Sequence, residues 1–293
     1  MSQDHRLQQQ RFELKYLVPE GLTQAIRDFT SCYLELDDYS VGKPDYSYDI
    51  HSVYLDSPAL DTHHATINGD KNRFKLRLRY YDGHPNSPVF FEIKRRVNDC
   101  ILKSRCGVRR EAVPLLLSGQ MPEPDHLISR EARHFASLHR FIELQQLLKA
   151  RPRLHNNYKR EAWVSTHDNS IRVTFDRRIC IEPHFDNEAS GFMRRPRQIY
   201  PEAVVLELKF TNRFPNWFRA LVERFNLMRS TASKYCGGIE FVGREHFETR
   251  RRHDSALSPV DFHTDGLNRG AMAAAEVTAA AVAELSTPVL IPT

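Results

Sequence analysis

The sequence predicts an α+β fold built on an eight-stranded antiparallel β-barrel tunnel, with flanking helices over the outside of the strands. Two patterns lead to this fold class. Apolar and polar residues alternate in many segments, which is the period of a strand with one buried face, and helical spacing fills the gaps between them. Alternation also favours antiparallel pairing, because parallel strands are buried on both faces and are apolar throughout.

Eight segments carry the strand pattern. In chain order they are residues 11–18, 48–56, 72–82, 88–97, 101–111, 153–166, 170–182 and 203–210. Helical periodicity predicts helices at residues 19–31, 57–67, 126–149 and 214–226, and a shorter one from Ser233 to Gly243. Pro19 suits the first turn of its helix, where a backbone N–H group would have no partner.

One face of most of these strands is rich in charge, because alternate residues of a strand share a face. In the strand near 72–80 that face holds Arg73, Lys75, Arg77 and Arg79, opposite an apolar face. Six other strands repeat the pattern, in chain order, with Arg11, Glu13 and Lys15; Glu92, Lys94 and Arg96; Lys103 and Arg105; Tyr158 and Arg160; Arg172, Thr174 and Asp176; and Glu207 and Lys209.

An antiparallel sheet ordinarily turns such a face to water, and for any single strand that is the default interpretation. The set as a whole favours another one, because Arg dominates it. Basic neighbours about 7 Å apart on one face repel by roughly 2 kcal/mol at an effective dielectric near 20, and a bound anion would remove that cost. Closing the sheet would gather the charged faces in one lumen and leave no open edges.

The chemistry of these residues suits a lumen that binds phosphate and metal together. The planar fork of Arg bridges two phosphate oxygens and stays protonated when crowded. The few acids on the same faces are Glu13, Glu92, Asp176 and Glu207, and carboxylate oxygens are the ligands that hard divalent cations prefer. The pattern therefore predicts a site for a polyphosphate-type anion with a divalent metal.

Composition is compatible with this prediction. The chain has 293 residues, of which 41% are hydrophobic and 27% charged, so it can bury a sizeable core. A net charge of +5 indicates an anionic partner without choosing which one. The five cysteines form no C-x-x-C pair, and no signal peptide or membrane-spanning segment is visible. We therefore expect a cytoplasmic protein with reduced thiols, no transmembrane segment and an oligomeric state that the sequence leaves open.

The chain divides into three parts by composition. Residues 1–10 are predicted to be a flexible N-terminus, residues 11–248 a single tunnel domain, and residues 249–293 a mobile Ala-rich tail. A docking helix for a partner is the alternative interpretation of the tail.

At the charged strands the sequence resembles the VTC-domain family, of the polyphosphate polymerase type, within the CYTH-like superfamily of triphosphate tunnel metalloenzymes. The resembling pieces include RFELKY at 11–16, RFKLRLRYY at 73–81, FFEIKRR at 90–96, VLELKF at 205–210 and SKY at 233–235. The resemblance implies an eight-stranded tunnel that binds ATP, triphosphate or polyphosphate with Mn²⁺ or Mg²⁺ as cofactor.

The resemblance also implies roles for individual residues. Combined with the charged faces, it assigns catalytic phosphate contacts to Arg77, Arg79, Arg160, Arg172 and Lys234. Substrate binding is assigned to Lys15, Arg73, Lys75, Lys94, Lys103, Arg105, Tyr158, Lys209 and Ser233. Metal binding is assigned to Glu207 and Glu13.

One departure from the superfamily pattern bears on the reaction. Many tunnel enzymes begin with Glu-x-Glu-x-Lys, and here the first position is Arg11, so only Glu13 remains. That favours polyphosphate synthesis from ATP by phosphoryl transfer. Three alternatives stay open: a hydrolase acting on inorganic triphosphate or a nucleoside triphosphate, a non-catalytic polyphosphate-binding protein, and a nucleic-acid-binding protein. The last is disfavoured because the chain has no zinc-finger spacing or RNP-like aromatic motif, so no nucleic acid is expected as a partner.

Overall fold

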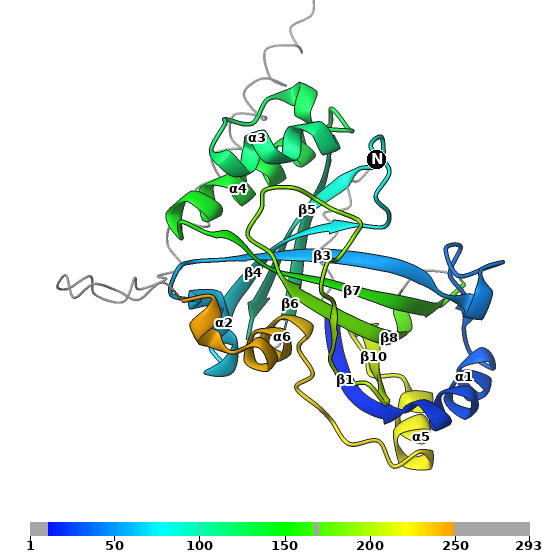
Figure 1. Ribbon diagram of the computed structural model, residues 1–293. Coiled ribbons are helices and arrows are strands. Elements are labelled where there is room, and N and C mark those ends of the chain that lie inside the picture. Colours follow the sequence, from blue (N-terminus) through cyan, green and yellow to red (C-terminus); the bar gives the residue numbers. More distant parts are fainter. Residues whose placement is uncertain (1–10, 99, 167–169, 249–293) are drawn as a thin grey trace, which may run out of the picture. The chain divides into compact units, whose positions relative to one another are not determined.

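A single large antiparallel sheet dominates the computed structural model, which describes residues 11–98, 100–166 and 170–248 (Figure 1). Its eight long strands follow the order β1-β10-β8-β7-β3-β4-β5-β6. They are β1 (Arg11–Pro19), β3 (Tyr48–Asp56), β4 (Asn72–Tyr80), β5 (Val89–Val97), β6 (Cys100–Val108), β7 (Arg151–Val164), β8 (Ile171–Pro183) and β10 (Ala203–Thr211). Each lies within three residues of a predicted strand. The predicted 1–10 segment and 249–293 tail lie outside the described residues.

The prediction of an eight-stranded closed barrel needs correction on two points. Within the described residues the sheet has ten strands, because β2 (Glu35–Leu36) pairs with β7 and β9 (Arg197–Gln198) pairs with β8. Two residues are too few to show a strand's alternation, so the sequence pattern misses both. The described pairings also leave β1 and β6 at the two ends of the strand order, so the sheet is not closed by backbone hydrogen bonds.

Side chains nevertheless bring the ends of the sheet together. Nζ of Lys94, on β5, lies 2.9 Å from Oε2 of Glu13, on β1. β1 is the first strand of the order and β5 is next to the last, so this contact requires a strongly curled sheet. One concave face therefore collects side chains from both ends.

Six helices flank the sheet within the described residues. They are α1 (Thr23–Ser31), α2 (Asp61–Ile67), α3 (Val113–Ser118), α4 (Ala132–Leu147), α5 (Asn216–Arg224) and α6 (Lys234–Val242). Five correspond to predicted helices. No helix was predicted at α3, whose six residues are too few to show a helical period, and the preceding strand was predicted to run to residue 111, into the 3-10 turn at Arg110–Ala112. The predicted helix 126–149 begins later, at Ala132, after a 3-10 turn at Pro124–His126.

Four of the helices, α1, α3, α4 and α5, cover the convex face of the sheet, where many apolar side chains of the strands point. Leu76, Leu78 and Phe91 pack with Leu116 and Phe141, which come from α3 and α4. At the other end of the strand order, Leu206 and Phe175 pack with Ile26, Phe218 and Leu221, which come from α1 and α5 (Figure 1). These two outer cores agree with the predicted alternation of the strands, whereas on the cavity side Tyr54 and Tyr158 pack with Tyr235 and Ile239 of α6.

Candidate functional site

The charged faces of the strands line one cavity of about 330 Å³. Among the described residues, its lining holds twelve basic side chains against two acidic ones, Glu13 and Glu207. The basic residues are Lys15, Arg73, Lys75, Arg77, Arg79, Lys94, Arg95, Arg96, Arg160, Lys209, Arg229 and Lys234. The volume falls in the range of small-ligand sites, and the charge excess selects an anionic ligand.

Strand register stacks the charges in rows across the sheet. Lys75 of β4 pairs with Lys94 of β5, and Lys94 pairs with Lys103 of β6. The next row holds Arg77, Glu92 and Arg105 in the same three strands. Directly opposite side chains lie about 5 Å apart at Cβ, so a row of three lysines is repulsive unless anions compensate it.

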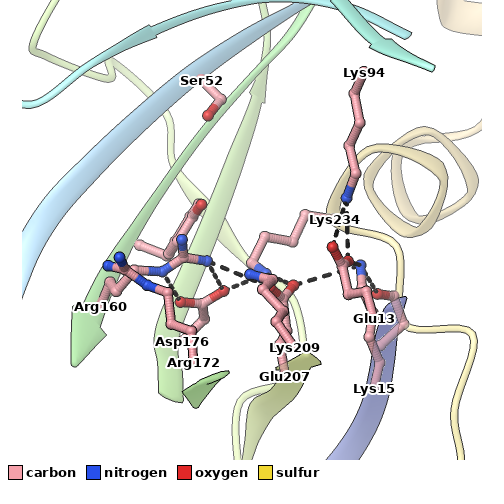
Figure 2. Close-up of polar contacts among 12 residues, drawn as sticks. Glu13, Lys15, Ser52, Lys94, Arg160, Arg172, Asp176, Glu207, Lys209 and Lys234 are labelled. Carbon is pink, nitrogen blue, oxygen red and sulfur yellow. Dashed lines mark hydrogen bonds and ion pairs between the residues drawn. The ribbon is translucent and has the colours of Figure 1, made fainter. Parts of the chain in front are cut away.

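Glu13 and Glu207 provide part of that compensation on β1 and β10. Nζ of Lys15 lies 3.2 Å from Glu13 and 3.4 Å from Glu207, so one ammonium group bridges the two carboxylates. Glu207 also contacts Lys209 at 2.5 Å and Lys234 at 3.4 Å (Figure 2). Burial by itself would raise the pKa of both carboxylates, but the surrounding ammonium groups outweigh it and hold the pKa below its usual range. Both carboxylates therefore stay ionised.

Asp176 orders the second group of cations. Its two oxygens accept from Arg160 at 2.6 and 2.7 Å, the bidentate geometry typical of a strong guanidinium–carboxylate pair. Nζ of Lys234, the first residue of α6, lies 2.5 Å from Asp176 (Figure 2). Ser233 begins that helix as its N-cap and accepts from the backbone N–H of Cys236. The helix start thereby delivers Lys234 into the cavity.

Glu92 pairs with a third group of basic side chains. It is fully buried on β5 and accepts from Nε of Arg77 at 2.6 Å. Lys103 and Arg105 approach it at 3.2 and 3.5 Å. Burial lowers the pKa of Lys103 to about 8 and that of Lys209 to about 7. Both lysines would gain charge if an anion bound beside them.

Two polar side chains next to this group have hydrogen-bonding capacity left over. Arg79 is buried, and its Nε has no hydrogen-bond partner although its Nη2 donates to Tyr158 at 3.1 Å. Asn156 on β7 is fully buried, and neither of its amide atoms has a partner. Buried polar atoms are ordinarily satisfied, so both side chains have atoms that can hydrogen-bond to a ligand or to water.

The pKa of the Tyr54 hydroxyl reflects the positive charge of the cavity. Burial by itself would raise the pKa of its hydroxyl, but the charges of Arg77, Arg79 and Lys75 outweigh burial and lower the pKa to about 8. Nη1 of Arg77 donates to this hydroxyl at 3.4 Å. A tyrosine ionises this readily only where an anion is strongly favoured.

Most of the residues predicted for the site lie together in this cavity. They are Glu13, Lys15, Arg73, Lys75, Arg77, Arg79, Lys94, Tyr158, Arg160, Glu207, Lys209, Ser233 and Lys234. The other three do not line it. Arg172 binds Asp37 at 2.5 Å, while Lys103 and Arg105 contact Glu92.

Sequence reasoning missed several polar residues of the site. Arg229 and Thr231 reach the cavity from the segment before α6, which has no periodic pattern to place it. Asp37 comes from a short turn. Alternation on the strands could have found Ser52, Tyr54 and Asn156, because they share a face with cavity residues. They were missed because the candidate faces were chosen by their charged residues, and these three side chains are uncharged.

The carboxylates around the cavity decide whether it can hold the metal that the family resemblance implies. Within the described ranges, no group of three or more His, Cys, Asp or Glu residues stands close enough to hold a metal ion. Glu13 and Glu207 are the pair available, bridged by Lys15. This set fits a cation such as Mg²⁺ that takes one or two carboxylates and completes its shell with substrate phosphates and water.

The chain was compared with known proteins. A family model described as the VTC domain matches residues 10–242, which is most of the chain. A search of curated proteins returned no match. No helix in the described part of the chain is long and apolar enough to cross a bilayer.

Two solved structures are distantly similar. One, from Bacillus halodurans and named as a candidate adenylate cyclase, has 12% identity and a TM-score of 0.43, covering 77% of this chain and 94% of its own. Another, from Pyrococcus horikoshii, has 13% identity and a TM-score of 0.37, covering 79% of this chain and 98% of its own. At these values neither similarity says anything about activity.

Proposed function

The chain belongs to the VTC domain family, and from that premise we propose that it is a phosphoryl-transfer enzyme that holds a nucleoside triphosphate in its cationic cavity and makes inorganic polyphosphate from ATP. One observation carries the proposal: within the described residues, the cavity lining holds twelve basic side chains and two acidic ones. Such an excess is stabilised by a ligand that brings several negative charges in a small volume, as a triphosphate does.

The phosphate contacts follow from which guanidinium and ammonium groups face the cavity. Arg77, Arg79 and Arg160 are held by carboxylates or a tyrosine on one side and keep further N–H groups for phosphate oxygens. Lys234 adds a charge from the helix start. Because Arg172 is paired with Asp37 outside the cavity lining, we assign it no direct phosphate contact.

The reaction needs positioning and charge neutralisation more than covalent help from the protein. A terminal oxygen of a phosphate chain attacks the γ-phosphorus of ATP, a new P–O bond forms, and the bond to the β-phosphate oxygen breaks to release ADP. The attacking oxygen is already ionised, so no protein base is required. This agrees with the ion pairing of Glu13 and Glu207, the two carboxylates that line the cavity, since neither is left unpaired to act as a base.

Metal binding falls to the two carboxylates that line the cavity. Glu13 and Glu207 would hold Mn²⁺ or Mg²⁺ once phosphate draws Lys15 and Lys209 away from them. When bound, such a cation supplies Lewis-acid stabilisation of charge on the phosphate oxygens. The lysines meanwhile keep the carboxylates ionised and ready for it.

The test is a product assay with the purified full chain, ATP and Mn²⁺ or Mg²⁺, with and without a short phosphate primer. We expect long phosphate chains on a polyphosphate gel together with one ADP per phosphate incorporated. Arg79→Ala should abolish the chains, whereas Arg133→Ala, at an exposed position on α4, should leave them unchanged. Orthophosphate as the sole product would replace the proposal with a hydrolase, and tight triphosphate binding without any product would replace it with a binding protein.

A further inference from the structure

A cluster of aromatic rings stands at one end of the cavity. The cavity face of β4 runs from Arg73 through Arg79, and Tyr81 comes directly after the last residue of this strand. Tyr48 begins β3 and pairs with the cavity residue Arg160 of β7. Tyr39, Tyr48, Tyr81 and Phe90 pack against one another there, and we call these four residues the aromatic mouth.

The rings of the aromatic mouth are not an ordinary core cluster. Tyr39 is 69% exposed, although its ring is nearly parallel to that of Tyr81, at 4° and 6.3 Å between centroids. The other three rings are partly buried. A core would hide such a ring, whereas a stacking platform leaves its face open to a planar ligand.

Two arginines hold the platform in place. The guanidinium of Arg105 lies 3.5 Å from the ring centroid of Phe90, and its Nη2 donates to the hydroxyl of Tyr81 at 3.2 Å. Nη2 of Arg172 lies 3.5 Å from the hydroxyl of Tyr48, which itself donates to Asp37 at 3.2 Å. These two arginines do not line the cavity. Their guanidinium groups therefore contact the aromatic mouth instead of the phosphates.

The spacing suits a molecule with phosphates at one end and a flat ring at the other. Phe90 of β5 lies directly opposite the cavity residue Arg79, and directly opposite side chains lie about 5 Å apart at Cβ. A ribose spans a gap of that order between a base and its phosphates. An inorganic phosphate chain, in contrast, has no group that would use aromatic faces.

We propose that the aromatic mouth binds the base of a nucleoside triphosphate by stacking, and thereby makes the protein prefer ATP to inorganic tripolyphosphate. This inference rests on the proposed function for the placement of the phosphates. Base–aromatic stacking accepts any base and grows with ring size, so purine nucleotides should bind more tightly than pyrimidine nucleotides.

The experiment is calorimetric binding of ATP and of tripolyphosphate to the full chain and to Tyr39→Ala. We expect Tyr39→Ala to weaken ATP about tenfold and to leave tripolyphosphate unchanged. Tyr39→Phe should bind ATP like the wild type, because it keeps the ring. Phe185→Ala, which removes a ring that is 54% exposed and packs with Phe247, is the matched control and should change neither affinity.

Equal affinities of wild type and Tyr39→Ala for ATP would overturn the inference, as would an equal loss for ATP and tripolyphosphate. The proposed function fails separately. If ATP binds with the expected dependence on Tyr39 but the product assay yields no phosphate chains, the aromatic mouth stands and the polymerase does not. If phosphate chains form and Tyr39→Ala binds ATP as tightly as the wild type does, the polymerase stands and the aromatic mouth does not.

Discussion

At the scale of single residues, the cavity carboxylates balance part of the positive charge around them. Glu207 lies within 4 Å of four cations: Lys15, Lys209, Lys234 and Arg160. Each ion pair satisfies part of the charge, yet Nε of Arg79, 4.0 Å from Glu92, and the side-chain amide of Asn156 make no hydrogen bond. The site is thus held together by internal pairs that a phosphate chain can replace.

The ionisation of Tyr54 allows the positive electrostatic potential of the cavity to be measured. Because nearby arginines lower its pKa to about 8, one tyrosine should ionise near that pH in the ligand-free protein. Bound tripolyphosphate would neutralise those arginines and move the ionisation to higher pH. Ultraviolet absorbance of tyrosinate during a pH titration measures both states. Tyr54→Phe should lack the early transition, and an early transition that survives in this variant would contradict the assignment.

Removal of the Glu207 charge should cost stability. In Glu207→Gln four cations lose a buried partner, and uncompensated buried charge costs about 3–5 kcal/mol. We expect the free energy of unfolding, measured by urea denaturation, to fall by that order, and added tripolyphosphate to restore part of it. Glu245→Gln, at a surface site with 77% side-chain exposure, is the control. A variant as stable as the wild type would show that Glu207 does not hold these cations.

At this scale the sequence predicted which side chains share a strand face more reliably than it predicted the partner of each side chain. Alternation placed Arg77, Arg79 and Glu207 correctly on one face, because it is a local property of a strand. Arg172 also lies on that face, but its partner Asp37 is 135 residues away in the chain. No periodic pattern foresees a contact with a turn at that separation, so its expected phosphate role could not be checked from sequence.

At the scale of elements, α6 depends on the absence of side chains at its centre. A Cβ on Gly238 would lie 2.5 Å from Cδ2 of Leu154 and 3.3 Å from Cγ2 of Ile181, so the helix packs directly on β7 and β8. This close contact fixes the helix whose first residue is Lys234. The glycine therefore serves packing, and the cavity charge depends on that packing.

Gly238→Val should displace α6. Overpacking of this kind costs about 1–3 kcal/mol, and movement of Lys234 should weaken triphosphate binding as well. Thermal unfolding and calorimetry measure the two effects. Gly21→Val is the matched control, because a Cβ there would meet nothing within 4 Å and the backbone is not in the left-handed region. Unchanged stability and affinity in Gly238→Val would show that α6 is not anchored at this point.

Element prediction succeeded where segments were long and periodic. The eight long strands and five of the helices fall close to their predicted ranges, whereas α3, β2 and β9 were missed because they have two to six residues. Strand order and the meeting of the two sheet ends depend on contacts such as that between Lys94 and Glu13, 81 residues apart. Local patterns do not contain that information, so the closed eight-stranded barrel was an inference that the described pairings do not support.

At the scale of the whole described domain, one enclosed region carries far more positive than negative charge. Such self-repulsion destabilises the folded state unless a ligand relieves it. The rigid outer cores under α3 and α4, and under α1 and α5, hold the charges in place despite the repulsion. Ligand binding and stability should therefore be strongly linked.

Tripolyphosphate should stabilise the folded chain. A ligand that binds only the folded state at a hundred times its dissociation constant adds about 2.7 kcal/mol of stability, which a thermal unfolding experiment detects. Sulfate at the same ionic strength is the control and should give a much smaller shift, because it cannot span several cationic groups. Equal shifts with both anions would indicate general screening instead of a specific site.

The most direct test of the account is a crystal structure of the chain grown with tripolyphosphate and Mn²⁺. We predict phosphorus atoms inside the cavity, in contact with Arg77, Arg79, Arg160 and Lys234. Phosphate confined to the outer groove formed by Gly69, Lys71 and Asn98, with the cavity side chains still paired to one another, would contradict the central claim.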